Sequence, residues 1–358
     1  MFARRSILAG MIAACLAPKS TWAEAGNPAF LSAARAADGS YVLCGLSETG
    51  DITFRIDLPA RGHAAAAHPM RPHAVAFARR PGSFAMVLDC ASGDVLQRLH
   101  APVGRHFYGH GTFTNDGEIL ATTENDFEAG SGVIGLWDAR NGYVRIGEIP
   151  SGGVGPHDIR TLSDGTFAVA NGGIETHPET GRTKLNIPTM RPNLSYVSVD
   201  GDVLDVVELA RELHKNSIRH LAVSTSGQVA MGLQWQGDVA DKVPLVALHD
   251  RATGSLLLNQ SHSSKQMKGY VGSVAMSNDK IAVTSPRGAT VQILHAQDLS
   301  VLQKDSLRDV CGVAHMSAGF VITSGSGDFQ VLGDGVRAKQ ATLSWDNHLV
   351  ELRAGQRL

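Results

Sequence analysis

Short apolar runs recur along the chain and are separated by turns rich in Gly, Asp and Asn. The clearest example lies in residues 110–150, where HGTFTNDG and EILATTEND form one pair of runs and GVIGLWDARNG and YVRIGEIP form a second. Apolar, β-branched runs of this length, bounded by turn residues, are typical of strands joined in antiparallel hairpins. The pattern therefore predicts a four-stranded antiparallel sheet over this unit.

The same four-strand unit repeats along most of the chain. Repeated units of this size bury their apolar faces by stacking on one another around an axis. The innermost strands are expected to begin near seven positions, His63, His110, His157, Arg219, Val271, Cys311 and His348. The sequence therefore predicts an all-β fold, a seven-bladed β-propeller with four antiparallel strands per blade.

The two ends of the chain are predicted to share a blade. The N-terminal runs FLSAARA, YVLCGLSETG and DITFRIDLP supply three strands but no innermost strand, and NHLVEL near the C-terminus supplies a spare one. A C-terminal strand that completes the first blade closes the ring and leaves no open sheet edge.

Residues 1–23 are predicted to be a signal peptide. Arg4 and Arg5 precede an apolar run from Ile7 to Ala17, and a small residue, Ala23, offers a cleavage site near Glu24. The paired arginines are similar to a twin-arginine export signal, and the general secretory route stays open as the alternative. We expect a periplasmic protein whose residues 24–358 form one domain, with no transmembrane segment, because the apolar run is too short to span a bilayer.

Charge and cysteine content exclude several other classes of protein. The chain has 32 basic and 34 acidic residues and no Lys/Arg run, so we expect no nucleic-acid partner. Beyond the leader, Cys44, Cys90 and Cys311 lie far apart and form no C-x-x-C pair. We expect them to be small buried residues and not a disulfide framework.

Five innermost strands carry a histidine at or near their start: His63, His110, His157, His220 and His348. In a propeller this end faces the same side as the loops between second and third strands. Those loops are expected to be long at 124–132, 172–193 and 235–244, so histidines and loops should meet around one channel mouth.

Two interpretations of these histidines stay open. Neutral imidazoles that converge bind transition metals such as iron or copper, and nearby oxygens could complete or orient such a site. The candidate oxygens are those of Glu124, Asp126, Asp158 and Glu175. In the alternative, each histidine only locks its blade to the next one.

Further polar residues near this face are candidates for ligand binding. One innermost strand is preceded by three residues that could bind an anion, Arg105, His106 and Tyr108. The other candidates lie in or beside the long loops and are Asn125, Asp126, Asn171, His177 and Lys184. The sequence contains no Gly-x-Ser-x-Gly nucleophile elbow, and we assign no catalytic residue. We therefore expect a binding protein rather than an enzyme.

Several long segments carry a family resemblance. RHFYGHGTF, TTENDFEAGSGVIGLWDA, GPHDIRTLSDGTFAVANGGIETHPETGRTKLN, TMRPNLSYV and SIRHLAV resemble the bacterial family catalogued as domain of unknown function 1513. The resemblance spans about Phe30 to Leu352. It implies an exported seven-bladed propeller from iron-acquisition gene clusters, with imelysin-like or di-haem periplasmic proteins as partners. It assigns no activity. We therefore expect a periplasmic binding protein linked to iron or another transition metal; the alternatives are an interaction scaffold with structural histidines and a metal-dependent enzyme.

Overall fold

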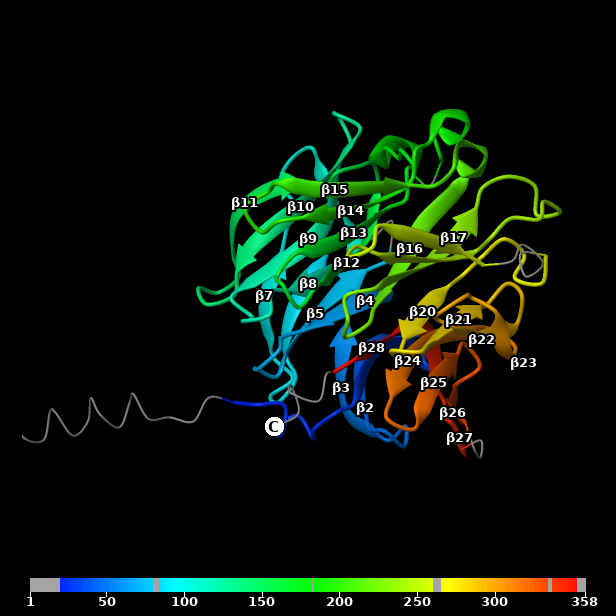
Figure 1. Cartoon of the computed structure of the whole chain (residues 1–358). Helices are drawn as coiled ribbons and strands as arrows, with labels where there is room; N and C mark the ends of the chain where they lie inside the picture. Colours follow the sequence, from blue (N-terminus) through cyan, green and yellow to red (C-terminus); the bar gives the residue numbers. More distant parts are fainter. Residues whose placement is uncertain (1–19, 80–83, 182, 260–264, 334–336, 353–358) are drawn as a thin grey trace, which may run out of the picture.

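The structure is a computed structural model that describes residues 20–79, 84–181, 183–259, 265–333 and 337–352. These residues form seven four-stranded antiparallel sheets that follow one another around a ring (Figure 1). The predicted seven-bladed propeller is therefore confirmed. The predicted leader lies almost entirely in residues 1–19, outside the described residues. Among the described residues, no helix is long and apolar enough to cross a membrane.

In the first four blades, the strands succeed one another from the channel outwards. Blade 1 consists of β28 (Ser344–Glu351), β1 (Phe30–Arg35), β2 (Tyr41–Leu46) and β3 (Ile52–Leu58). Blade 2 consists of β4 (Gly62–Ala67), β5 (His73–Ala78), β6 (Ala85–Asp89) and β7 (Val95–Leu99). Blade 3 consists of β8 (Arg105–Phe113), β9 (Ile119–Asp126), β10 (Ser131–Asp138) and β11 (Val144–Pro150). Blade 4 consists of β12 (Pro156–Thr161), β13 (Phe167–Asn171), β14 (Asn193–Val197) and β15 (Val203–Glu208).

The remaining three blades follow the same order. Blade 5 consists of β16 (Asn216–Val223), β17 (Val229–Trp235), β18 (Val246–Asp250) and β19 (Ser255–Leu258). Blade 6 consists of β20 (Ser273–Met276), β21 (Lys280–Ser285), β22 (Thr290–His295) and β23 (Val301–Ser306). Blade 7 consists of β24 (Val310–Met316), β25 (Gly319–Ser324), β26 (Asp328–Leu332) and β27 (Arg337–Gln340).

The chain ends meet in blade 1, as the spare C-terminal strand predicted. Strand β28 pairs antiparallel with β1, with Phe30 opposite Glu351 and Leu31 opposite Val350. The Ser32 hydroxyl donates to the His348 carbonyl oxygen over 3.0 Å. In Figure 1 the red strand β28 lies with the blue N-terminal strands. The ring is thus closed by pairing residues more than 300 positions apart in sequence.

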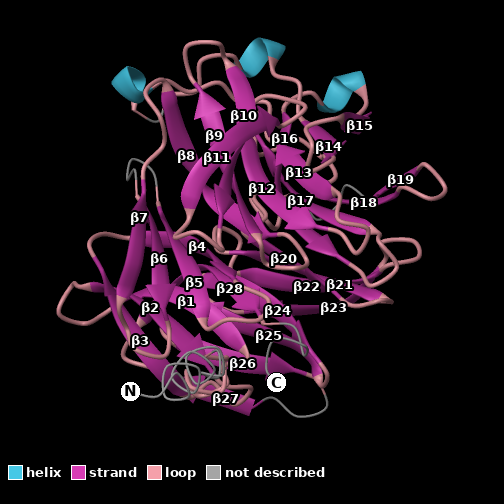
Figure 2. Ribbon diagram, turned by 90° about the vertical axis from the view of Figure 1, so that its left-hand side faces the viewer, coloured by secondary structure: helices cyan, strands magenta, loops and turns pink. Residues whose placement is uncertain are grey.

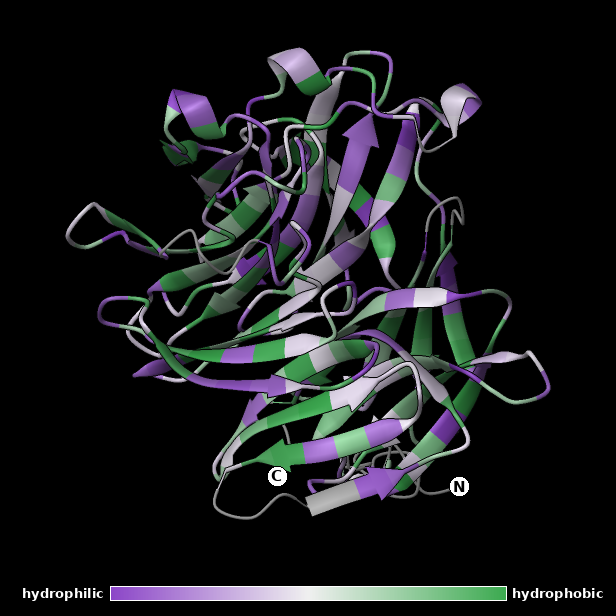
Figure 3. Ribbon diagram, turned by 90° about the vertical axis from the view of Figure 1, so that its right-hand side faces the viewer, coloured by the Kyte–Doolittle hydropathy of each residue, from purple (hydrophilic) through white to green (hydrophobic). Residues whose placement is uncertain are grey.

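The hydrophobic core lies between the blades. Seven clusters of buried side chains fill the seven interfaces, one between each pair of neighbouring blades. At the closing interface, Phe30 and Trp345 of blade 1 pack in one cluster with Phe329 of blade 7. Hydrophobic residues recur along the strands of the blades (Figure 3). Because each blade is buried on both faces, loss of one strand disturbs two interfaces.

One of the expected long insertions is absent, and another is confirmed. Residues 124–132 are mostly strand, because β9 continues to Asp126 and β10 begins at Ser131. The expected long loop there is wrong, since the polar residues pair across the hairpin and leave only a short turn. The segment 172–193 is a long loop that holds two 3₁₀ turns, η1 (Pro178–Thr180) and η2 (Ile187–Thr189). With η3 (Arg211–Leu213), they lie at one end of the molecule (Figure 2).

Cys44, Cys90 and Cys311 are buried and unpaired, as expected. Burial raises the pKa of the Cys44 and Cys311 thiols to about 12, so both stay protonated and unreactive at neutral pH.

Trp22 lies on the leader side of the predicted cleavage point, yet its side chain is buried in the core between blades 1 and 2. Its indole N–H donates to the His68 carbonyl oxygen over 2.9 Å. A cut after Ala23 would remove this contact. The position of the cut stays a prediction, which the mass of the exported protein tests.

Candidate functional site

The five predicted histidines lie at irregularities of the innermost strands. At each of these five histidines, the pairing of the strand with the second strand of its blade shifts register. Such a bulge inserts an extra residue and re-aims a side chain. On β8 the bulge includes Gly109, at φ 98°, and a Cβ there would lie 2.9 Å from the His63 ring. Glycine is therefore required here, where β8 passes the His63 ring of blade 2.

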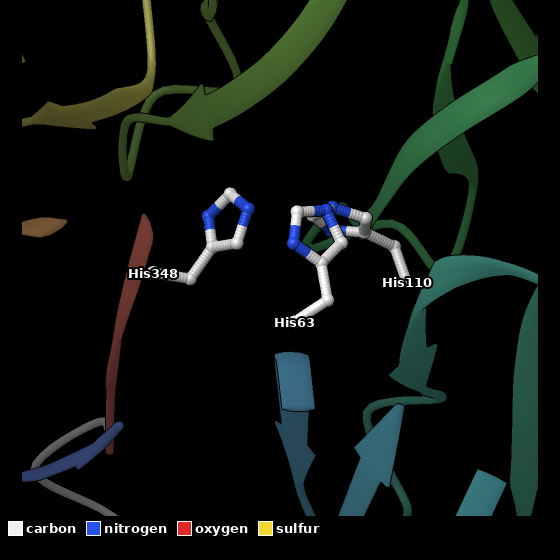
Figure 4. Close-up of side chains that lie close together, drawn as sticks. All are labelled: His63, His110 and His348. Carbon is white, nitrogen blue, oxygen red and sulfur yellow. The ribbon is translucent and has the colours of Figure 1, made fainter. Parts of the chain in front are cut away.

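The five imidazole rings converge in the channel. Ring centroids are 4.7–5.0 Å apart around the circuit His63–His110–His157–His220–His348 and back to His63. Figure 4 shows three of the rings, from β4, β8 and β28, pointing toward one another. Two overlapping trios each bring one nitrogen per ring within 4.8 Å of the others: His63, His110 and His348, and His110, His157 and His220. His110 belongs to both trios. We call these five residues the histidine cluster.

Two rings are held through Nδ1 by the following blade. His110 Nδ1 lies 3.2 Å from Asp158 Oδ1, and His157 Nδ1 lies 2.9 Å from the Arg219 carbonyl oxygen. A carboxylate and a carbonyl can only accept, so both Nδ1 atoms carry the proton and donate. In the neutral rings the lone pair then lies on Nε2. Each of these two histidines therefore contacts the next blade through Nδ1 and also presents Nε2 to the other rings.

Asp158 is the acidic residue that contacts the cluster. It is almost fully buried and also accepts from the Ile159 and Leu221 amides, each over 2.9 Å. Burial alone would raise the pKa of Asp158, but the Arg160 guanidinium and the His110 ring hold it well below its usual range. Asp158 therefore stays ionised and keeps the His110 proton on Nδ1.

Other ring nitrogens are buried without a hydrogen bond. In the described part of the chain, neither nitrogen of His220 has a partner, nor does Nε2 of His348. Burial, together with neighbouring histidines, holds the pKa of both rings well below its usual range. Burial and the Arg219 guanidinium do the same for His157. The three rings are therefore neutral at pH 7 and offer lone pairs.

These lowered pKa values predict acid sensitivity of the metal-free protein. Below the unfolded pKa of about 6.5, the unfolded chain takes up protons that the buried rings refuse. Each such ring therefore lowers the free energy of unfolding by about 1.4 kcal/mol per pH unit below 6.5, and contributes no slope above pH 7.5. We expect His220→Gln to reduce this slope, measured by urea unfolding between pH 7.5 and 5. The matched control is His100→Gln, at an exposed position. Equal slopes in both variants would contradict the expectation.

The other candidate oxygens lie away from the cluster. Glu124 is fully buried in β9, where its carboxylate accepts from Arg145 over 2.8 Å. Asp126 pairs with Arg105 over 2.9 Å. The Glu175 amide donates to Asn186 within the long loop. Of the four candidate oxygen ligands, the structure brings only Asp158 to the histidines.

Most of the predicted ligand-binding residues are engaged within their own blade or loop. Arg105 also pairs with Glu148 over 2.8 Å, so its charge is neutralised inside blade 3. Asn171 is buried and bonds Ser151, Asn193 and Ser195 of its own blade region.

Of the next three candidates, His106 and Asn125 lie in strands β8 and β9, and His177 lies in the long loop. His106 lies 3.3 Å from the Asn125 amide, and Asn125 donates to the Thr176 carbonyl oxygen. His177 caps η1. Of the ligand-binding candidates named from the sequence, Tyr108 and Lys184 line the cavity described next.

A cavity of about 430 Å³ lies at the channel mouth above the histidine cluster. It includes His63, His157 and His220 in its lining, with Tyr108, Trp235 and Tyr270 around it. Three arginines that the sequence did not single out also line it: Arg79, Arg219 and Arg287. Arg79 and Arg287 each follow the second strand of their blade, in a turn that faces the mouth. Only the long loops at this position were considered in the sequence, so these two arginines in short turns were missed.

A seven-bladed propeller with histidines gathered at one channel mouth is the class of protein that this fold and site define. The chain belongs to the family described as protein of unknown function (DUF1513), which matches residues 56–352. The predicted family is therefore confirmed. No curated protein matches the chain.

Solved structures support the fold. The chain is similar to hydrazine synthase from Kuenenia stuttgartiensis, at 12% identity and a TM-score of 0.59, over 84% of this chain and 89% of that one. It is also similar to the WD40 repeats of RRP9, at 14% identity and a TM-score of 0.59, over 85% and 86% of the two chains. At these identities the likeness concerns the propeller fold alone.

Proposed function

We propose that this protein is a periplasmic metal-binding propeller that holds a transition-metal ion, iron or copper, in the histidine cluster. The observation that carries the proposal is the anchoring of His110 and His157 through Nδ1, which leaves both Nε2 lone pairs among buried rings. Metal-ligating histidines characteristically donate their other N–H to a carboxylate or a backbone carbonyl. For His110 this partner is the carboxylate of Asp158, and for His157 it is the carbonyl oxygen of Arg219.

The distances suit a metal. His63 Nε2 and His110 Nε2 are 3.2 Å apart. Two nitrogens bound to a tetrahedral ion at about 2.0–2.1 Å would be separated by roughly 3.3–3.4 Å. In the metal-free protein, His63 donates to the His110 lone pair; a metal replaces that proton with little movement of either ring.

Burial argues in the same direction. A buried polar atom without a hydrogen bond costs about 1–3 kcal/mol. His220 has two such nitrogens and His348 one, within the described residues. A bound ion would satisfy nitrogens of this kind, and imidazole nitrogen suits iron, copper, zinc and nickel.

The compartment and the partners complete the proposal. The predicted leader supports export to the periplasm, and the family resemblance supports a role in iron acquisition beside imelysin-like or di-haem proteins. No group of the described residues is assigned a catalytic role, so the protein is proposed to bind and hand over its ion without chemical change.

Metal content of the exported protein tests the proposal. The full chain is expressed with its own leader, recovered from the periplasm without chelators, and assayed for first-row metals. We expect about one transition-metal ion per chain, in line with a site built from several imidazoles. Protein that stays in the cytoplasm would contradict the compartment, and exported protein free of metal would contradict the site. Replacing Arg4 and Arg5 by Lys distinguishes the two export routes.

A further inference from the structure

The cavity above the histidine cluster carries an unusual set of charges. Its lining includes four cationic side chains and, among the described residues, no carboxylate. They come from four different mouth-facing segments: Arg79 after β5, Lys184 from the long loop of blade 4, Arg219 from β16 and Arg287 from the β21–β22 turn. Cationic side chains that converge from separate blades repel one another unless an anion lies between them.

The same charges would oppose a bare metal ion. Arg79 has one ion pair, with Asp346 at 3.7 Å, and Asp346 also pairs with Arg61. Below the cavity, Asp158 already pairs with Arg160. Asp346 is thus shared between Arg79 and Arg61, and Asp158 faces Arg160, so neither carboxylate lies among the residues that line the mouth.

We propose that the mouth cavity binds a small oxyanion with two or more negative groups, such as a di- or tricarboxylate or a phosphate. Arginine and lysine recognise both through charge-assisted hydrogen bonds. The volume, about 430 Å³, lies within the roughly 300–1,000 Å³ of small-molecule sites. Where a metal occupies the cluster, the anion would supply oxygens to it from above, a consequence that rests on the proposed function.

Two of the cations are held ready for such a ligand. The Arg287 guanidinium lies over the Tyr270 ring, 4.2 Å from its centre, and forms no ion pair in the described part of the chain. Lys184 donates to the Gln236 side-chain oxygen. Partial burial, with Arg219 and Arg287 nearby, holds the pKa of Lys184 below its usual range. An aromatic platform orients the guanidinium without neutralising it.

The test uses the full chain freed of metal, so its outcome does not depend on whether the histidines bind an ion. Citrate, inorganic phosphate and glycerol are titrated separately by calorimetry at low ionic strength. We expect citrate, phosphate or both to bind, glycerol to give no signal, and added salt to weaken binding. The anion that binds more tightly identifies the class of ligand. Tighter binding of citrate indicates a polycarboxylate, and tighter binding of phosphate indicates a phosphate compound.

Substitutions locate the site. Arg287→Gln and Lys184→Gln should each lower the affinity for the anion that binds more tightly by about tenfold, the usual loss for one charged hydrogen bond. The matched control is Arg251→Gln, because Arg251 also lies over a tyrosine ring, that of Tyr196, but in the β18–β19 turn, at the other end of its blade from the mouth. All three residues lie on the surface or partly so, and melting curves confirm that the variants fold. Failure of both anions to bind, or equal weakening by Arg251→Gln, would overturn the proposal.

Discussion

A chain that ends at Asp346 is expected to lose most of its stability. The truncation removes five of the eight residues of β28, among them His348 and Leu349, and also Leu352. Leu352 is fully buried, and its amide donates to the Ala29 carbonyl oxygen. Loss of a buried leucine side chain costs about 2–5 kcal/mol, and the truncation removes two. Domains of this kind are stable by only about 5–15 kcal/mol in total.

The ring geometry enlarges this effect. Without residues 347–351, the edge of β1 from Phe30 to Ser32 is unpaired, and the closing interface with blade 7 loses Leu349. Unpaired edges promote aggregation. Thermal unfolding measures the outcome, with a chain ending at Leu352 as the matched control because it keeps all of β28. An unchanged melting temperature for the chain ending at Asp346 would refute closure by this strand.

The repeat made the fold predictable from the sequence. Four-strand units with turn residues between them define blades wherever they occur, and an N-terminal blade short of one strand requires another from elsewhere. The position of the histidine cluster was predictable for a related reason. Residues at equivalent positions of the blade repeat lie at the same level of the channel, so His110 and His157 had to lie on the same side. The predicted strand start at His110 was wrong, because β8 already begins at Arg105.

Side-chain partners were not predictable in this way. Arg105 was expected to be available for an anion, but it pairs with Glu148, which lies 43 positions away on the outermost strand of the same blade. Asn171 was expected beside a long loop as a ligand-binding residue, yet it ends β13 and donates to three buried partners. Such pairings depend on strand register and bulges, which the hydrophobic pattern does not specify.

The carbonyl anchor of the cluster also could not be predicted, because His157 donates to the backbone carbonyl of Arg219, 62 residues further on. Asp158 was expected either as a ligand or as a group that orients the rings, and the structure places it beside His110 Nδ1, where it orients that ring. The difference matters because an orienting carboxylate fixes which nitrogen is free for a metal.

Loss of His110 and His157 together should remove metal binding. His110 belongs to both trios, so its removal leaves neither intact, and His157 is the second ring whose Nε2 is fixed inward. Removal of an orienting partner alone lowers metal affinity 10–100-fold. Loss of two ligands should therefore weaken binding by at least about a hundredfold, roughly 2.7 kcal/mol. Because the pKa values of His157, His220 and His348 lie well below their usual range, protons should compete with the ion only in acid well below pH 6.

The most direct test is calorimetric titration of the metal-free full chain with iron, copper and zinc salts. Three proteins are compared: the wild type, the His110→Ala, His157→Ala double variant, and a His100→Ala, His295→Ala double variant. The control histidines lie outside the cluster. The account predicts that wild type and control bind at least one of these metals tightly and alike, while the cluster variant does not. A wild type that binds none of them, or a cluster variant that binds as well as the control, would contradict it.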